Sequence, residues 1–307
     1  MQRTLSRPVS VAGTGLHSGA PARATLRPAP PGTGIVFVRA DLPGHPLVRA
    51  LWDRVLQSPL ATRLVEGGVG VSTVEHLMAA FAGLGVHNAL VELRGPEVPI
   101  LDGSAAPWAR AILDAGVTEQ DAPLRALCVL EAVEVREGEA FARLEPAAAP
   151  VMRFAIDFPD AAIGRQELEL PLANGAFLRE LSDSRTFCRL SDVESMRAGG
   201  LALGGTVLNA VVVDGARVLT PGGLRRPDEA VRHKMLDAVG DLGLAGGPVI
   251  GRYVGARAGH ALTNRLLRAL FARAGAWEWV EVDDELAGRL PGAGVGPADL
   301  AALPAVA

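Results

Sequence analysis

The amino-acid sequence predicts an α+β fold that is built twice along the chain. Its 307 residues, 49% of them hydrophobic, suffice for two ordinary hydrophobic cores, so the length favours two domains. In both halves strand patterns are followed by helices, a strand and a helix, and the segment 117–126 between the halves breaks the apolar periodicity. We expect a first domain at 1–122, a second at 127–287, and a loosely ordered tail rich in Gly, Pro and Ala at 288–307.

The composition argues against several kinds of partner and against secretion. The net charge of -4 comes from mixed acidic and basic residues without a long basic run, which argues against nucleic acid and anionic membranes as partners. The start of the chain lacks the apolar segment of a signal peptide, and no apolar run is long enough to span a bilayer. The only cysteines, Cys128 and Cys188, provide no disulfide framework. We expect a cytoplasmic protein with no stable membrane insertion.

The strands and helices follow from period-2 and period-3.6 hydrophobic patterns bounded by turn residues. In the first half the predicted strands are 9–12, 22–27, 35–39 and 88–94, and the predicted helices are 72–85 and 105–114. In the second half the predicted strands are 127–136, 139–144, 151–158, 166–170, 206–213, 249–256 and 277–282, and the predicted helices are 174–181, 191–197, 227–242 and 260–271. The glycine-rich loop at 13–19 is expected to turn the chain, because no helix opens at its end as a phosphate-binding loop requires.

One stretch in the first half allows two interpretations. Ser72 followed three residues later by Glu75 matches a capping box, in which the two side chains bind the free backbone amides of the helix start. Ser191 and Glu194 match the same motif in the second half. The adjacent pair Glu75-His76 is also what metal hydrolases use when the histidine binds zinc and the glutamate takes a proton from water. These residues alone leave both roles open.

A polar stripe lies on the predicted helix 227–242. His233, Asp237 and Asp241 are spaced i, i+4 and i+8, so they project from one helix face, one turn apart. Imidazole and carboxylate groups at this spacing can bind one zinc ion from consecutive turns. Such a pair is more often a hydrogen-bonded pair at a surface, so the spacing by itself does not identify a metal site.

Motifs spread along the chain resemble one family. They are Thr14-Gly15-Leu16-His17-Ser18-Gly19, Ser72-Thr73-Val74-Glu75-His76-Leu77, Pro99-Ile100-Leu101-Asp102-Gly103-Ser104, Arg185-Thr186-Phe187, Leu203-Gly204-Gly205, Val231-Arg232-His233-Lys234-Met235-Leu236-Asp237 and Gly259-His260-Ala261-Leu262. Together they are similar to the zinc-dependent UDP-3-O-acyl-N-acetylglucosamine deacetylases of lipid A synthesis in Gram-negative bacteria. The resemblance runs from the N-terminus to about Val282, and it implies two similar domains, each a β-sheet against paired helices, with the active site at their interface.

The resemblance implies a metal centre and its reaction. His76, His233 and Asp237 become the three protein ligands of one Zn²⁺ per chain, a set that leaves a fourth position for water; Fe²⁺ is the alternative metal. The implied reaction removes the N-acetyl group from UDP-3-O-(3-hydroxyacyl)-N-acetylglucosamine, with water as co-substrate, and releases acetate and the free amine.

Five further residues receive catalytic roles from the resemblance. Glu75 is the general base, and His260 is a protonated imidazole that serves the transition state or the departing amine. Asp241 stabilises the charged form of His260. Thr186 is expected to hold the oxyanion of the tetrahedral intermediate, and Lys234 to supply positive charge.

Substrate contacts are also expected from the resemblance. Phe187 is assigned to the sugar or its acetyl group, and Phe158 and Leu16 are further expected substrate contacts. Arg257 is assigned to the UDP phosphates, because Ala140 falls near a position expected to be basic. The acyl chain is placed around Val193 and 201–213. Of the remaining histidines, His17 is expected to shape a loop or the substrate edge, whereas His45 and His87 match no motif and are expected to be solvated.

Two other functions stay open beside this one. A zinc amidohydrolase of another acetylated sugar would need the same metal site without an acyl pocket. A relative that only binds a nucleotide sugar would have no need of Glu75 or His260, and both are present. We expect a monomer whose partners are the acylated UDP-sugar and water, with no nucleic acid.

Overall fold

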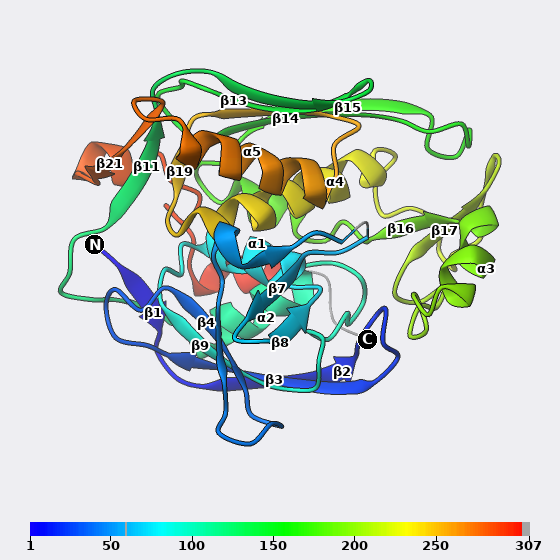
Figure 1. The fold of residues 1–307 in the computed structure, drawn as a ribbon, viewed down its shortest axis with the longest axis horizontal. Coiled ribbons are helices and arrows are strands. Elements are labelled where there is room, and N and C mark those ends of the chain that lie inside the picture. Colours follow the sequence, from blue (N-terminus) through cyan, green and yellow to red (C-terminus); the bar gives the residue numbers. More distant parts are fainter. Residues whose placement is uncertain (59, 303–307) are drawn as a thin grey trace.

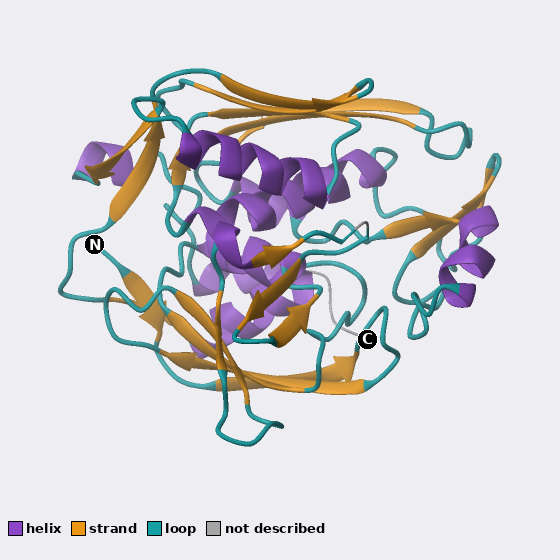
Figure 2. Ribbon diagram, viewed as in Figure 1, coloured by secondary structure: helices purple, strands orange, loops and turns teal. Residues whose placement is uncertain are grey.

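The computed structural model describes residues 1–58 and 60–302. Four layers are stacked in the order sheet, helices, helices, sheet (Figure 1), and the helices of both halves fill the space between the two outer sheets (Figure 2). The predicted α+β class is confirmed. Both sheets are therefore covered by helices on their inner faces, where the apolar residues of each strand form the core.

The first half contributes one outer sheet and two helices. Its five-stranded sheet has the order β2 (Val9–Thr14), β3 (Pro21–Pro28), β9 (Ala89–Arg94), β4 (Ile35–Arg39) and β5 (Leu47–Arg49). The helices are α1 (Glu75–Leu84) and α2 (Ala106–Ala115). Smaller elements are β1 (Arg3–Leu5) paired with β10 (Val117–Glu119), a single 3-10 turn at Trp52–Arg54, and the three-stranded sheet β6 (Val55–Leu56), β7 (Arg63–Glu66) and β8 (Val69–Ser72).

The second half contributes the other outer sheet and its helices. The sheet has the order β12 (Val133–Glu137), β13 (Ala140–Glu145), β20 (Arg252–Ala256), β14 (Val151–Asp157) and β15 (Arg165–Pro171). The main helices are α4 (Glu229–Leu242) and α5 (His260–Ala272), with shorter ones at η2 (Phe177–Leu181), α3 (Leu190–Ala198), η3 (Gly243–Ala245), α6 (Asp284–Ala287) and η4 (Pro297–Ala302). Two small sheets are β19 (Val249–Ile250), β11 (Arg125–Val129), β21 (Trp277–Glu281) and β16 (Phe187–Arg189), β17 (Val211–Asp214), β18 (Arg217–Val218).

The two outer sheets share one topology. In each, the first pair of strands is antiparallel, the central strand pairs antiparallel with the second strand and parallel with the next, and the last pair is antiparallel. The central strands β9 and β20 come late in the sequence of each half. Each lies between strands that precede it in the sequence. A helix precedes each central strand, α1 and α4, and these two helices carry most of the predicted site. The repeat explains why the site lies where the halves meet.

Close packing of α1 against α4 joins the halves at their centre. At Gly240 an added Cβ would lie 2.1 Å from the carbonyl oxygen of Glu75, so only glycine allows this approach. Leu77, Leu236 and Val239 are buried in the surrounding core. The first turn of α1 is thereby held against the middle of α4, which brings His76 close to Asp237.

Several predicted elements have different limits in the structure. The predicted strand 249–256 is two strands of different sheets, because Gly251 lies too close to Val129 and the backbone of Glu145 for a side chain, and the chain changes sheets there. The predicted strand 127–136 is likewise divided between β11 and β12, and only 211–213 of the predicted strand 206–213 is extended. The region 117–126 is not all linker, because β10 pairs with β1. The predicted domain limits stay a prediction.

Both predicted capping boxes are wrong. Helix α1 begins at Glu75 with no side-chain cap, because Ser72 belongs to β8, where its backbone pairs with Arg63. Helix α3 begins at Leu190, also without a side-chain cap, so Ser191 lies inside the helix. Long-range strand pairing and an earlier helix start override the local motif in these places.

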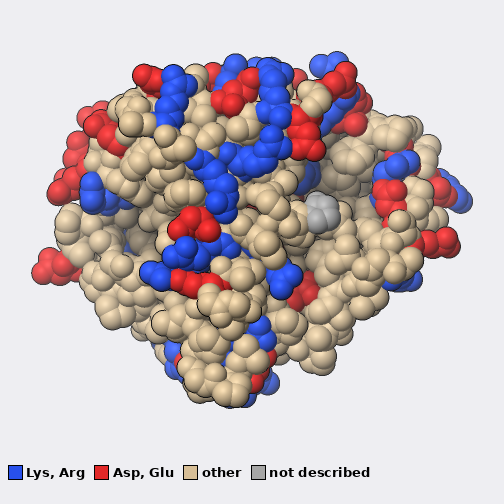
Figure 3. Space-filling view, in the orientation of Figure 1, with Lys and Arg blue, Asp and Glu red and all other residues tan. Residues whose placement is uncertain are grey.

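The tail is packed where the structure describes it. Arg3 donates hydrogen bonds to the carbonyl oxygens of Leu84 and Gly292, and Leu290 is buried. The loose order predicted after Gly288 is therefore wrong for this part, whereas 303–307 lie outside the described residues. Basic and acidic side chains lie beside one another over the face in Figure 3, as the mixed charge pattern predicted. No helix in the described part of the chain is long and apolar enough to cross a membrane.

Candidate active site

Three predicted metal ligands meet between α1 and α4. One ligand atom each from His76, His233 and Asp237 lies within 4.8 Å of the others, and all three side chains are buried. Oδ1 of Asp237 is 3.6 Å from Nε2 of His76 and 3.4 Å from Nε2 of His233. This oxygen has no hydrogen-bond partner in the structure although it is buried. A buried carboxylate oxygen without a partner, facing two imidazole nitrogens, fits a divalent cation.

The other ring nitrogen of His233 fixes its orientation. Nδ1 lies 3.0 Å from the backbone carbonyl oxygen of Ser184, which can only accept, so Nδ1 carries the proton and Nε2 presents its lone pair. Burial lowers the pKa of His233 to about 4, which keeps the ring neutral. Both effects prepare His233 to bind a metal through Nε2.

Lys234 binds the second oxygen of the aspartate. Its Nζ donates a hydrogen bond of 3.0 Å to Oδ2 of Asp237. Burial alone would raise the pKa of Asp237, but the attraction of the cations Lys234 and His260 holds it well below its usual range. Burial lowers the pKa of Lys234, yet the attraction of Asp237 outweighs burial and raises it. Asp237 is therefore ionised, with Oδ1 left for a cation.

Glu75 stands at the first turn of α1, directly before His76. Its Oε2 accepts a hydrogen bond of 3.0 Å from the backbone amide of Thr62, and its Oε1 lies 3.9 Å from Nε2 of His260. Burial raises the pKa of Glu75, and the attraction of His260 offsets this only in part. Because no capping box occupies it, this carboxylate faces the metal-ligand group and can accept a proton there.

His260 begins α5 and faces Glu75 from the opposite side. Its Nδ1 is 2.8 Å from Oδ2 of Asp241, and its Nε2 is 3.8 Å from Oδ2 of Asp237. Burial lowers the pKa of His260, but the attraction of Asp241 and Asp237 exceeds that effect and raises it to about 9. The imidazole is therefore held in its charged form near neutral pH. The catalytic roles that the family resemblance implies for His260 and Asp241 stay a prediction.

The aromatic residues predicted to contact substrate adjoin the metal ligands. The ring of Phe187 lies edge-on to His233, with centroids 6.2 Å apart, and Phe158 packs edge-on to Phe187 at 5.3 Å. The neighbouring Thr186 is held through its backbone, which bonds the carbonyl oxygen of Gly103 and the amide of Val211. The structure thus brings these three residues to the edge of the site, while the role of the Thr186 hydroxyl stays a prediction.

The glycine-rich loop of the first half contacts the second half. Leu16 accepts a backbone hydrogen bond from Gly204, and His17 accepts one from Leu203. The buried carboxylate of Glu97 holds this loop by accepting hydrogen bonds from the backbone amides of His17 and Ser18. Leu16 is thereby placed against the region 201–205, and the loop serves a structural purpose, as expected for His17.

Two predictions concern the rim of the site. Arg257 forms ion pairs with Glu139 and with Asp157, so its contact with phosphate stays a prediction and would compete with two carboxylates. Leu203, Val207 and Leu208 leave apolar side chains exposed in the region 201–213 where an acyl chain was predicted. They are consistent with an apolar chain lying there.

His45 and His87 differ in their surroundings. His45 is exposed, as predicted. His87 is not a solvated residue: its Nδ1 accepts a hydrogen bond of 3.0 Å from the backbone amide of Arg3. Burial lowers the pKa of His87 to about 3. The prediction for His87 is wrong because the ring joins strand β1 to the end of α1.

Sequence reasoning missed residues that act on the site through others. Thr62 donates its hydroxyl to Oδ1 of Asp241 at 2.5 Å in addition to its amide contact with Glu75. Buried Arg185 and Glu229 are joined by hydrogen bonds and fix the segment that contains Ser184. Thr62 stands alone in its stretch, and Ser184 acts through its backbone, so neither gives a signal in the sequence. For the pair Arg185 and Glu229, the only signal in the sequence is that Arg185 directly precedes the predicted site residue Thr186.

The arrangement combines three chemical capabilities in one buried place. It offers two imidazole nitrogens and an ionised carboxylate to a cation, a carboxylate able to accept a proton, and an imidazolium able to donate one. A cation with a proton acceptor and a proton donor on its two sides suits hydrolysis of an amide or ester.

Comparisons with known proteins agree with this chemistry. A family model described as UDP-3-O-acyl N-acetylglycosamine deacetylase matches residues 2–272. The chain is 50% identical over 288 residues to a UDP-3-O-acyl-N-acetylglucosamine deacetylase of Phenylobacterium zucineum (strain HLK1), covering 93% of this chain and 98% of that protein. It is 51% identical over 279 residues to the protein of the same name from Myxococcus xanthus (strain DK1622), covering 91% and 89%.

Proposed function

Because this chain belongs to the family of UDP-3-O-acyl-N-acetylglucosamine deacetylases, we propose how its own residues carry out that reaction. The chain is an amide hydrolase of lipid A biosynthesis: it removes the N-acetyl group from UDP-3-O-acyl-N-acetylglucosamine, and the products are acetate and the free amine. The other two functions considered from the sequence, an amidohydrolase of a different sugar and a binding protein without activity, have no observation in their favour.

We propose that His76, His233 and Asp237 hold one zinc ion. The partnerless Oδ1 of Asp237 and the lone pair on Nε2 of His233 support this ligand set. A bound zinc ion supplies Lewis acidity, which lowers the pKa of water and polarises a carbonyl oxygen. The same donor set also suits Fe²⁺, so the natural metal is identified by metal analysis of the protein as purified from cells.

Glu75 acts as the general base in this proposal. The Thr62 amide fixes Oε2, which leaves Oε1 to take the proton of the attacking water. Burial raises the pKa of Glu75 above its usual range, and this makes the carboxylate a stronger base than an exposed one.

His260 acts as the general acid. Its Nδ1 donates to Asp241, and because the negative charge of Asp241 also keeps the ring in its imidazolium form, Nε2 carries a second proton, which passes to the nitrogen of the departing amine. Until then the imidazolium stabilises negative charge on the former amide oxygen, together with the Thr186 hydroxyl and the ammonium group of Lys234. Lys234 is already hydrogen-bonded to Asp237, so it stabilises the oxyanion less than His260 does.

The substrate is bound by the rim of the site. Phe187 and Phe158 pack against the sugar and its acetyl group, and Leu16 closes its edge. The acyl chain lies along 201–213 near Val193, and Arg257 contacts the UDP phosphates. We further propose that the chain acts as a monomer in the cytoplasm, with the acylated UDP-sugar and water as its partners.

One observation carries the proposal: the buried carboxylate oxygen of Asp237 lies within 3.6 Å of two imidazole nitrogens and has no hydrogen-bond donor among the described residues. The test is acetate release from the acylated UDP-sugar before and after treatment with a chelator. We expect loss of activity that Zn²⁺ restores. Full activity without metal would contradict the proposed centre, and equal activity on UDP-N-acetylglucosamine would contradict the acyl-binding region.

A further inference from the structure

A large cavity lies between the two halves, apart from the candidate active site. Its volume is about 540 Å³. Helix α1 contributes Met78, Phe81 and Ala82 to its wall, and α4 contributes Val239 and Leu242. None of the proposed metal ligands, catalytic residues or substrate-binding residues lines it, and neither does any residue of the acyl-binding region 201–213. Part of its wall is therefore formed by the same two helices that carry active-site residues.

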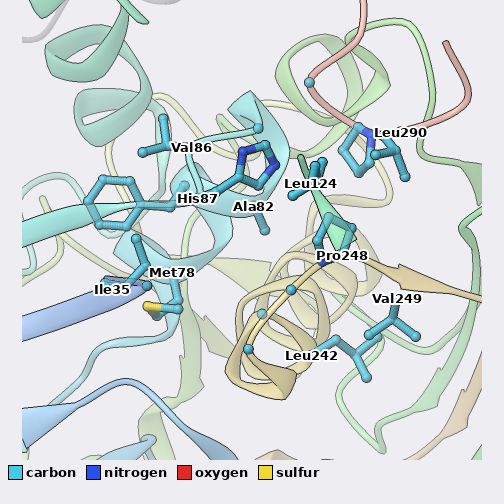
Figure 4. Close-up of a pocket in the computed structure, with 18 of the residues that line it drawn as sticks. Ile35, Met78, Ala82, Val86, His87, Leu124, Leu242, Pro248, Val249 and Leu290 are labelled. Atoms are coloured by element: carbon cyan, nitrogen blue, oxygen red, sulfur yellow. The ribbon is translucent and has the colours of Figure 1, made fainter. Parts of the chain in front are cut away.

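The wall is mainly apolar. Figure 4 shows side chains of the first half, such as Ile35 and Met78, facing residues of the second half, such as Leu242 and Val249. The tail closes another side with Leu290–Gly292, and an added Cβ at Gly292 would lie 2.6 Å from Cα of Gly85. Because the family match ends at residue 272, this side of the cavity is built from residues beyond it.

His87 offers one polar group to this apolar space. Its Nδ1 accepts the hydrogen bond from the amide of Arg3, so the neutral ring carries its proton on Nε2. Burial lowers the pKa of His87 to about 3, so the ring stays neutral at physiological pH. No acceptor for Nε2 is found in residues 1–58 and 60–302, and Figure 4 shows the imidazole among the side chains of the wall. The cavity thus presents a fixed N–H donor.

The other polar groups of the wall favour an acidic head group. Among residues 1–58 and 60–302 no acidic residue lines the cavity, whereas Arg49 and Arg125 do. Arg49 is paired with Glu66, but Arg125 lies over the ring of Trp279, at 5.9 Å, with no carboxylate in ion-pair distance in the described part of the chain. A cationic ligand would meet only positive charge at this wall.

We propose that this cavity is a second ligand site, which binds an amphiphile with an apolar body and a carboxylate head that accepts a hydrogen bond from His87. The volume falls in the range of sites that bury small organic ligands, which are apolar spaces with a few fixed polar groups.

The test uses the zinc-loaded enzyme with its active site saturated by the deacetylated acyl product. This saturation keeps the acyl-binding region of the active site occupied. Dodecanoate, below its micelle concentration, is titrated by calorimetry, and dodecyltrimethylammonium provides the same chain with the opposite charge. We expect one dodecanoate per chain and at least tenfold weaker binding of the cation. No binding, or equal binding of both amphiphiles, would overturn the proposal.

Two substitutions locate the ligand. Ala82→Phe fills the cavity from α1 and should weaken dodecanoate binding at least tenfold while turnover is retained, whereas Ala272→Phe on the exposed side of α5 should leave binding unchanged. His87→Leu removes the N–H donor and should weaken dodecanoate binding about threefold or more while leaving the binding of dodecyltrimethylammonium unchanged. Unchanged binding in Ala82→Phe would show that the ligand lies elsewhere.

A spectroscopic measurement does not depend on filling the cavity. Trp279 lines the wall, so dodecanoate brominated along its chain should quench tryptophan fluorescence through short-range contact. We expect most of the quenching to disappear in Trp279→Phe and to persist in Trp52→Phe, because Trp52 stacks on Phe271 outside the wall. Equal quenching in parent and Trp279→Phe would contradict the location.

Discussion

His260 and Asp241 are joined across the site by a bond of 2.8 Å between Nδ1 and Oδ2, and Thr62 donates to the other oxygen of the same carboxylate. The aspartate is thereby fixed by groups from both halves of the chain. Its charge keeps His260 protonated, which is the state that a general acid requires.

Substituting Asp241→Asn should move the basic limb of the pH profile to lower pH. The pKa of His260 is raised to about 9, so the active imidazolium is present below that pH and is lost as pH rises through it. Without the anion the imidazolium is less favoured, and we expect a shift of about one unit or more. The measurement is kcat/KM against pH for parent and variant. A basic limb that does not move would contradict the role given to Asp241, and Asp192→Asn on the exposed face of α3 is the control.

Removing one metal ligand should empty the site. His76→Ala or Asp237→Ala leaves two protein ligands, so the metal should dissociate during dialysis and turnover should fall to a small fraction of the parent value. Metal content by mass spectrometry checks this, with Asp192→Ala as a carboxylate control. Full metal occupancy in either ligand variant would exclude that residue from the centre.

The variant Glu75→Gln separates catalysis from stability. Gln can still accept the hydrogen bond from the Thr62 amide, and the substitution removes a buried charge, so the melting temperature should stay or rise. Turnover should fall about 10²- to 10⁴-fold, because the general base is lost. Glu97→Gln is the matched control: it loosens the loop at His17, lowers the melting temperature and keeps kcat within about tenfold of the parent. A destabilised Glu75→Gln with normal turnover would assign Glu75 a structural role.

Much of the site was predictable because it lies on regular helices. His233, Asp237 and Asp241 share one helix face at a spacing that the sequence displays, and the adjacent Glu75 and His76 begin another helix. Helix periodicity does not say which helices meet. The meeting of α1 and α4 depends on Gly240, whose close approach to Glu75 is set by tertiary packing.

The failures have a common physical cause, which is competition from distant partners. The capping box at Ser72 looks complete locally, but pairing of β8 with β7 takes Ser72 into a strand and releases Glu75 to the site. The carbonyl of Ser184 orients His233 although any residue type could provide it. His87 looks like an isolated polar residue until strand β1 covers it. Contacts of this kind need the fold before they can be named.

The buried pair Arg185 and Glu229 should position a metal ligand from a distance. Glu229 accepts hydrogen bonds from the backbone and the guanidinium of Arg185, next to the carbonyl of Ser184 that orients His233. Glu229→Gln leaves a buried guanidinium without its anion, at a cost of about 3 to 5 kcal/mol in unfolding free energy. Metal affinity should fall about 10- to 100-fold as the support of His233 loosens.

Denaturant unfolding and metal competition with a chelator measure both effects. Glu180→Gln is the control, because its half-exposed carboxylate also pairs with arginines, Arg226 and Arg232, and should change stability by less than about 1 kcal/mol. If Glu229→Gln lowers stability but leaves metal affinity unchanged, the pair stabilises the fold without positioning His233.

His87 should make folding stability depend on pH below neutrality. Its pKa is about 3 in the folded protein, lowered by burial and by the charges of Arg3 and the N-terminal amine, and about 6.5 when unfolded. The stabilisation is therefore complete above pH 6.5 and is lost as pH falls from 6.5 toward 3, because only the unfolded chain takes up the proton. Relative to His87→Gln, the parent should lose up to about 1.4 kcal/mol of unfolding free energy per pH unit in this window. Denaturant unfolding between pH 7 and pH 5 measures the difference between parent and variant. The pH dependence that comes from the buried His233 is the same in both proteins and cancels. His45→Asn, at an exposed position, should follow the parent; parallel curves for parent and His87→Gln would mean that His87 is not held neutral by the fold.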